Sequence, residues 1–417
     1  MAIEDQITLT APTSRNKFSS VHPVAAVAGG ASSERKRNSN FIDRLEAVRG
    51  VAAMMVAMGH SLVILPSFGW QEPIVFILLL IMNGRAAVTL FFVLSGLVLG
   101  LSLRRGKEVF QNELVVFSIR RVLRIYPAFL FCVVTIAMYL FFCFSDFSFP
   151  SAYICFESFY GDYHAPVTPE RLTSNFVFTS NSLNPVTWTL RIEMICSLLL
   201  PFLHWLSVKM SNTQRLLLLG GLITVGFFPK TNNNINFLFM FFSGYLLPMI
   251  GPNALGYLRA NRRRAIWVVA GALPLLFCSR LIIGRHVVLQ GGYLIETFGA
   301  SVLIACLLYA KDFRIYRILD HPVVRFYGKI SYSFYLWHFF CLFLVSRCVL
   351  DWISRNQLWH YSLLWAMILW FLSTIVATAI AYVSYRLIEK PFIQLSKEIC
   401  CRISTRMTAS HESPKRA

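Results

Sequence analysis

Apolar runs of membrane-crossing length alternate with short polar segments from residue 47 to residue 385. A bilayer core about 30 Å thick needs a helix of roughly 20 mainly apolar residues. The short run 74–81 is typical of a re-entrant or interfacial segment rather than a crossing. The pattern predicts an all-α membrane bundle of about ten crossings, at residues 47–65, 88–103, 128–144, 186–208, 216–228, 235–250, 266–283, 293–309, 331–350 and 363–385.

Basic residues are concentrated in every second loop between these runs. The loops concerned contain Arg104, Arg105, Lys107, Arg120, Arg121 and Arg124, then Lys209 and Arg215, then Arg259, Arg262, Arg263 and Arg264, then Lys311, Arg314, Arg317, Arg325 and Lys329. Positive residues favour the cytoplasmic side, so these loops and both basic termini are expected in the cytoplasm. A net charge of +19 in a chain that is 56% hydrophobic therefore indicates topology and contact with membrane lipids. We expect no nucleic-acid partner.

The chain divides into three parts by composition. Residues 1–43 are polar and basic and carry no cleavable signal peptide, so we expect a disordered cytoplasmic tail. Residues 44–395 would form the membrane domain, and residues 396–417 a second cytoplasmic tail. The ten cysteines fall mostly within apolar runs and show no paired CxxC spacing, so no metal site is expected.

The first apolar run carries two titratable residues, Arg49 and His60. Eleven positions at about 100° each bring both side chains to the same helix face, roughly 16 Å apart along the axis. With Arg49 at the membrane surface, His60 would lie about halfway through the bilayer core. A histidine bonded within the bundle is the structural alternative. An ionisable residue inside a crossing is, however, a functional candidate, and an imidazole can take a proton from a hydroxyl.

Other charged residues allow two interpretations each. Arg49 either pairs with Glu46 one turn earlier or binds an anionic substrate. Glu193 lies inside a crossing, where a charge needs a partner or a cavity. His338 ends an aromatic run and is suited to packing or to chemistry. The last group is Arg120, Arg121 and Arg124. These arginines either set the topology and contact lipid phosphates or bind the phosphates of a soluble cofactor.

Seven segments in order resemble acyltransferase family 3, whose membrane proteins include bacterial glycan O-acetyltransferases. Arg49 and His60 match the family's pattern of Arg, ten residues and His. The other segments are GRAAVTLFFVLSGLVL (84–99), RRVLRIYP (120–127), WTLRIE (188–193), FFSGYLL (241–247), YGKISYSFYLWH (327–338) and EKP (389–391). Glu46 and Ala47 replace a frequent Asp-Gly, and Ala87 replaces a frequent Gly.

The resemblance implies an O-acetyltransferase of the bacterial cell membrane. Its donor would be acetyl-CoA or another acyl-CoA in the cytoplasm, and its acceptor a hydroxyl of an envelope carbohydrate or glycolipid, with no metal. His60, Arg49, Glu193 and His338 would be catalytic, with His60 as general base in preference to an acyl-histidine. Arg120, Arg121 and Arg124 would bind the phosphates of CoA.

A transporter or flippase is the competing interpretation. In that case the same four residues, Arg49, His60, Glu193 and His338, would form a proton or substrate path. The sequence shows no internal repeat and no paired broken helices, which many transporters have. Covalent label on a glycan would favour the transferase, and movement of an unmodified solute the transporter.

Overall fold

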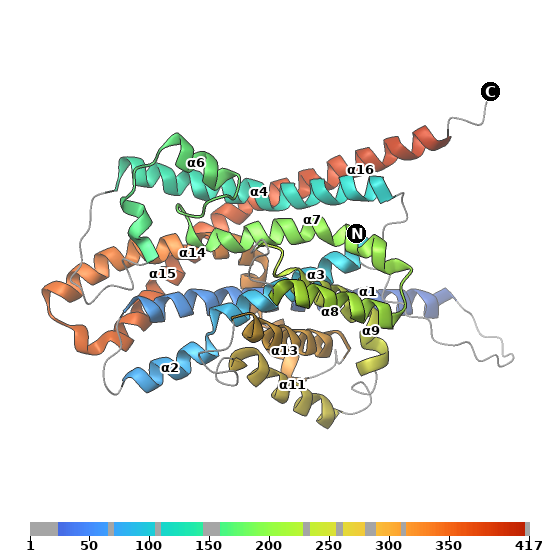
Figure 1. The fold of residues 1–417 in the computed structure, drawn as a ribbon, viewed down its shortest axis with the longest axis horizontal. Helices are drawn as coiled ribbons and strands as arrows, with labels where there is room; N and C mark the ends of the chain where they lie inside the picture. Colours follow the sequence, from blue (N-terminus) through green and yellow to red (C-terminus); the bar gives the residue numbers. More distant parts are fainter. Residues whose placement is uncertain are drawn as a thin grey trace.

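The computed structural model describes residues 24–65, 71–104, 110–144, 159–227, 234–255, 262–279, 289–309 and 314–412. Within these ranges the chain forms helices and no strand, which confirms the predicted all-α class. Figure 1 shows most of the long helices lying side by side along the long axis. The elements are α1 (Val24–Ile64), α2 (Gln71–Ile81), α3 (Gly84–Leu103), α4 (Phe110–Phe142), η2 (Gly161–His164), α6 (Pro169–Phe176), η3 (Pro185–Thr187), α7 (Trp188–Val208), α8 (Asn212–Phe227), α9 (Leu238–Leu255), α11 (Arg262–Phe277), α13 (Leu289–Tyr309), η4 (Arg314–Asp320), α14 (Pro322–Arg355), η5 (Trp359–Tyr361), α15 (Ser362–Ser384), η6 (Tyr385–Glu389) and α16 (Lys390–Glu412).

Seven of the described helical stretches are long and apolar enough to cross a membrane. They are Asp43–Ile64, Gln71–Leu103, Leu114–Phe142, Pro185–Val208, Gly291–Tyr309, Pro322–Ile353 and Ser362–Ile403. Three further predicted crossings correspond to α8, α9 and α11, which have 16, 18 and 16 residues. The count of ten therefore stays a prediction.

The apolar run 74–81 belongs to α2, a helix separate from α3. The break follows from Asn83, whose side chain accepts the backbone N–H groups of Arg85 and Ala86 and so caps the start of α3. At the other end, the side chain of Gln71 accepts hydrogen bonds from Ser362 Oγ and the Leu363 N–H. These bonds attach α2 to the start of α15.

Helices α1 and α14 pack with their backbones in contact. A Cβ atom added to Gly50 would lie 2.5 Å from the backbone nitrogen of Gly328, so only glycine fits at this crossing. Ten residues further along each helix, the rings of His60 and His338 stack. Residue numbers rise together from one contact to the next, so α1 and α14 run in the same direction. Small residues allow such close approach between membrane helices.

Helices α3 and α9 form a second close pair. A Cβ atom on Gly96 would overlap the carbonyl oxygen of Phe241, and one on Gly100 would meet the ring of Tyr245. From the first contact to the second, the residue numbers increase along both helices, so α3 and α9 are parallel. Their backbone contact leaves no room for side chains between them, because a side chain at Gly96 would collide with a main-chain atom.

Helix α13 runs parallel to α9. Ser243 Oγ of α9 lies 2.6 Å from Ser301 Oγ of α13. Further along both helices, the Tyr309 hydroxyl donates to the Leu247 carbonyl over 2.9 Å. Hydroxyl bonds of this kind add specificity to helix pairs in a membrane, where apolar contact alone does not distinguish neighbours.

The helices continue beyond the predicted domain boundaries. Helix α1 begins at Val24, inside the predicted tail of residues 1–43, while residues 1–23 lie outside the described ranges. Helix α16 continues past residue 395 to Glu412 and lies along α4, where Cys400 Sγ donates to the Val116 carbonyl. The first residues of α1 and the last of α16 lie at the same end of the molecule (Figure 1). The division into three domains stays a prediction.

Candidate active site

Two histidines that are far apart in the sequence meet in the middle of the bundle. The rings of His60 (α1) and His338 (α14) stack with their centroids 5.6 Å apart and their planes 28° apart. The rings of Phe159 and Phe339 contact His60 edge-on at 5.6 Å and 5.0 Å. His338 is buried, whereas His60 keeps part of its surface exposed. The structure therefore brings these two predicted site residues together.

The hydrogen bonds of His338 determine its tautomer. Its Nδ1 atom lies 2.7 Å from the Tyr335 carbonyl oxygen, which can only accept, so Nδ1 carries a hydrogen. Its Nε2 atom is buried and has no hydrogen-bond partner within the described part of the chain. In the neutral ring this nitrogen has a free lone pair beside His60. The arrangement can therefore accept a proton from a ligand.

The predicted need of Glu193 for a partner is met by Arg121. The Arg121 guanidinium of α4 forms an ion pair with the Glu193 carboxylate of α7. Ser95 of α3 donates a second hydrogen bond to the same carboxylate over 3.1 Å. Both charged side chains are largely buried, so the pair offsets the cost of removing each from water. Arg121 is thereby occupied inside the protein.

Arg49 and Glu46 make no close ion pair, although their charges attract each other. The Arg49 Nε atom is buried without a hydrogen-bond partner among the described residues. The arginine side chain lines a cavity. Arg124 of α4 likewise forms no ion pair with any described carboxylate, whereas its neighbour Arg120 is exposed.

The cavity beside Arg49 is small, with a volume of about 30 Å³. Its walls come from four helices, with charged groups, aromatic rings and hydroxyls. The lining residues are Arg49 from α1, Val88, Phe91 and Phe92 from α3, Thr189, Leu190 and Glu193 from α7, and Ser331, Tyr332 and Tyr335 from α14. Neither His60 nor His338 lines the cavity, but the ring of its lining residue Tyr335 lies 5.5 Å from the ring of His338.

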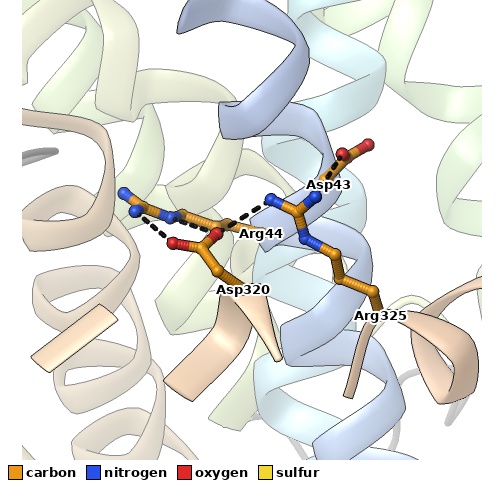
Figure 2. Close-up of polar contacts among 4 residues, drawn as sticks. All are labelled: Asp43, Arg44, Asp320 and Arg325. Atoms are coloured by element: carbon orange, nitrogen blue, oxygen red, sulfur yellow. Dashed lines mark hydrogen bonds and ion pairs between the residues drawn. The ribbon is translucent and has the colours of Figure 1, made fainter. Parts of the chain in front are cut away.

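An ion network that the sequence did not indicate joins α1 to the start of α14 (Figure 2). Asp320 accepts two hydrogen bonds from Arg44, at 3.0 Å and 2.6 Å, and a third from Arg325 at 3.0 Å. Arg325 also lies 3.3 Å from Asp43. The bonds from Arg44 hold the pKa of the Asp320 carboxyl below its usual value. The network fixes the relative position of the helices that carry Arg49 and the histidines.

The structure also identifies lining residues that sequence reasoning missed. Thr189 and Tyr335 line the cavity, although both lie in segments read as packing or as a family motif. A polar residue next to a charged position in a crossing, as Thr189 is near Glu193, could have signalled them. The described residues include no group of three His, Cys, Asp or Glu that could hold a metal ion.

Comparisons with known proteins agree on one class. A family model described as an acyltransferase domain, that of acyltransferase family 3, matches residues 42–386. A protein of Acidianus two-tailed virus whose name describes it as an acetyltransferase is 27% identical over 319 residues, or 72% of this chain and 83% of that protein. The peptidoglycan O-acetyltransferase OatA of Listeria monocytogenes is 24% identical over 383 residues, or 84% of this chain. The match spans 56% of the length of the Listeria protein. No solved structure matches the chain.

Proposed function

Because this chain belongs to acyltransferase family 3 and is an integral membrane acyltransferase, we propose that it moves an acetyl group from cytoplasmic acetyl-CoA to a carbohydrate hydroxyl. The acceptor would be an envelope or exported carbohydrate or a glycolipid, and the location the bacterial inner membrane. The observation that carries the proposal is that α1 and α14 together hold Arg49, which lines a cavity with Tyr335, and the stacked rings of His60 and His338. The two helices thus offer an anion-binding group and, about three turns further along α1, proton acceptors.

We propose that Arg49 and Arg124 bind the phosphates of the donor. A guanidinium suits phosphate because it presents several N–H donors in a planar fork. Neither residue makes a close ion pair with a carboxylate in the described ranges, whereas Arg121 has one with Glu193. Arg120 is exposed and would contribute only at the rim. The donor role thus falls mainly on two of the four arginines considered.

His60 would act as the general base. Its ring stacks on His338 and is partly exposed, and an acceptor hydroxyl from the outer side would meet a thioester from the cytoplasm there. His338 would support it, because its Nδ1–H is fixed on the Tyr335 carbonyl and its buried Nε2 has no hydrogen-bond partner among the described residues. General base catalysis contributes typically about a hundred- to ten-thousand-fold.

The relative directions of the helices support ten crossings, which would put both termini on the same side of the membrane. Parallel helices need an odd number of crossings between them in the chain. Only α4 and α7 are long candidates between the parallel pair α3 and α9, so α8 would cross as well. By the same argument α11 would cross between α9 and α13. Adding α8, α9 and α11 to the seven long apolar stretches gives ten crossings.

Reporter fusions test this topology. Fusions after Asn261 and Lys311 should read cytoplasmic, and fusions after Gly161 and Gln357 external. A reversed reading at any one position would contradict the ten-crossing arrangement.

The function is tested in inside-out vesicles supplied with isotope-labelled acetyl-CoA. Wild-type protein should place covalent label on a glycan or glycolipid, which mass analysis then identifies. His60→Ala should lower transfer by about a hundred- to ten-thousand-fold while donor binding is retained. His321→Ala removes an exposed histidine on the cytoplasmic side and serves as the control. Movement of an unmodified solute without labelled product would contradict the proposal.

A further inference from the structure

The hydroxyl of Tyr335 is buried beside the cavity and poorly bonded. Tyr335 is 7% exposed, and its oxygen lies 3.0 Å from Thr189 Oγ1 and 3.4 Å from the Val186 carbonyl oxygen. Hydroxyl donors usually approach their acceptors to about 2.7–2.8 Å. The Val186 contact is too long to count as a good bond. The tyrosine proton therefore has no strong acceptor in the protein.

Thr189 can donate either to the Val186 carbonyl or to the Tyr335 hydroxyl. Thr189 Oγ1 lies 3.0 Å from the Val186 carbonyl oxygen and has a single proton to give. When that proton goes to the Tyr335 oxygen, Thr189 orients the tyrosine hydroxyl, whose own proton stays available. Turning the Tyr335 proton toward a ligand then leaves the Val186 carbonyl with the backbone N–H of Trp188 as its donor. The Tyr335 hydroxyl can thus donate a hydrogen bond to a ligand that has an acceptor oxygen.

The position of the hydroxyl indicates which oxygen that is. Tyr335 and Thr189 both line the cavity that begins at Arg49. The Tyr335 ring lies 5.5 Å from the His338 ring, which in turn stacks on His60. Tyr335 therefore lies between the cavity and the histidine pair. The walls nearby are apolar, so a neutral donor here acts in a site of low dielectric.

We propose that the Tyr335 hydroxyl donates to the carbonyl oxygen of the donor thioester and stabilises the oxyanion formed there. The inference rests on the proposed function, since it needs an acyl thioester. The acceptor oxygen bonds to the carbonyl carbon while its proton goes to His60, and the C=O electron pair moves to oxygen. The C=O bond then re-forms, the C–S bond breaks, and the proton goes from His60 to the thiolate. Tyr335 keeps its proton throughout.

The test compares two tyrosines of α14, each of which lies close to a threonine hydroxyl on another helix. Tyr335→Phe removes the hydroxyl at the cavity, and Tyr327→Phe removes one that lies 3.0 Å from Thr378 Oγ1 outside it. Removing an oxyanion donor lowers kcat by about 100- to 1,000-fold. We expect that loss in Tyr335→Phe and near wild-type kcat in Tyr327→Phe. Binding of S-ethyl-CoA, which has no carbonyl oxygen, should be the same in both variants.

An infrared measurement gives a readout that a structural role would not affect. Acetyl-CoA labelled with ¹³C at the carbonyl should show a lower carbonyl stretching frequency when bound to the wild type without acceptor. The shift should persist in Tyr327→Phe and disappear in Tyr335→Phe. An unshifted carbonyl in the wild type would overturn the inference even if Tyr335→Phe does not reach the membrane.

The outcomes separate this inference from the proposed function. Equal kcat in Tyr335→Phe and wild type would overturn the role of Tyr335 and leave the transferase intact. No transfer from acetyl-CoA by the wild type would instead remove the proposed function. Equal losses of kcat and of S-ethyl-CoA binding in Tyr335→Phe would make the residue structural and also overturn the inference.

Discussion

The contact between α1 and α14 predicts a large effect from the smallest possible substitution, Gly50→Ala. The new methyl group would lie 2.5 Å from the nitrogen of Gly328 and 2.7 Å from the carbonyl carbon of Tyr327. Ordinary contacts of a Cβ atom begin at 3.4 Å. Both obstacles are main-chain atoms that cannot rotate away, so the helices must separate by about 1 Å locally. Overpacking of this kind costs about 1–3 kcal/mol of folding free energy.

The same separation of α1 and α14 should slow acyl transfer strongly, while the loss of folding free energy stays modest. Gly50 adjoins Arg49, and the two helices carry the stacked rings of His60 and His338. A displacement of about 1 Å in catalytic geometry can lower the rate by about 100-fold. We therefore expect Gly50→Ala to insert into the membrane, to unfold at a lower temperature and to transfer acyl groups about 100-fold more slowly.

Gly271→Ala provides the matched control. Gly271 lies in α11, and a Cβ atom added there meets nothing within 4 Å. Alanine replaces glycine in a helix with a gain of up to about 1 kcal/mol, so this variant should be at least as stable as the wild type. Thermal unfolding in detergent and acyl transfer at saturating donor measure the two effects. Wild-type transfer by Gly50→Ala would refute the view that this contact positions the site.

Three further predictions concern charged residues. Arg49→Lys should raise the acyl-CoA concentration required for half-maximal transfer, because an ammonium lacks the planar fork of donors; an unchanged requirement would remove Arg49 from donor binding. Arg124→Ala should weaken binding of S-ethyl-CoA more than Arg120→Ala, because Arg120 is exposed; equilibrium binding at matched membrane levels checks this, and the reverse order would contradict it. Because the pKa of Asp320 is lowered in the folded protein, its ionised carboxylate stabilises the fold at pH values above the unfolded pKa of about 3.9. This stabilisation is lost as the pH falls through the folded pKa. Melting temperatures against pH should therefore fall more steeply in acid for the wild type than for Asp320→Asn.

The sequence predicted the face of α1 correctly because helix geometry is local. Arg49 and His60 were placed on one face from their spacing alone, and both side chains do point toward α14. Their distance from other segments could not be predicted in this way. The stacking of His338 on His60 depends on the approach of Gly50 to Gly328, which is set by tertiary packing.

The neighbouring arginines of α4 show what the geometry of a single helix cannot predict. Arg120 and Arg121 differ by about 100° around α4, so one is exposed and the other is buried. The sequence does not reveal which of the two faces the interior, since that depends on the rotation of α4 against α7. The partner of Arg121, Glu193, lies on a different helix. The three arginines were therefore predicted as one group, whereas the structure gives each a different environment.

Short helices explain the uncertainty in the number of crossings. Helices α8 and α11 have only 16 residues each, which is below the length that hydropathy alone identifies with a crossing. Their direction becomes apparent only from contacts with neighbours, such as the backbone of α11 against Gly299 of α13. Such contacts are absent from the sequence pattern.

The pairing of α1 with α14 has a consequence for the order in which the protein is made. Arg44 and Asp320 are separated by 276 residues, and both flank the helices of the site. A ribosome adds about 5–20 residues per second, so α1 waits about 15 to 55 s for its partner. During that interval the face with Arg49 and His60 lies in the membrane without α14 beside it. A nascent chain released before α14 would therefore contain the arginine and histidine of the site but could not assemble it.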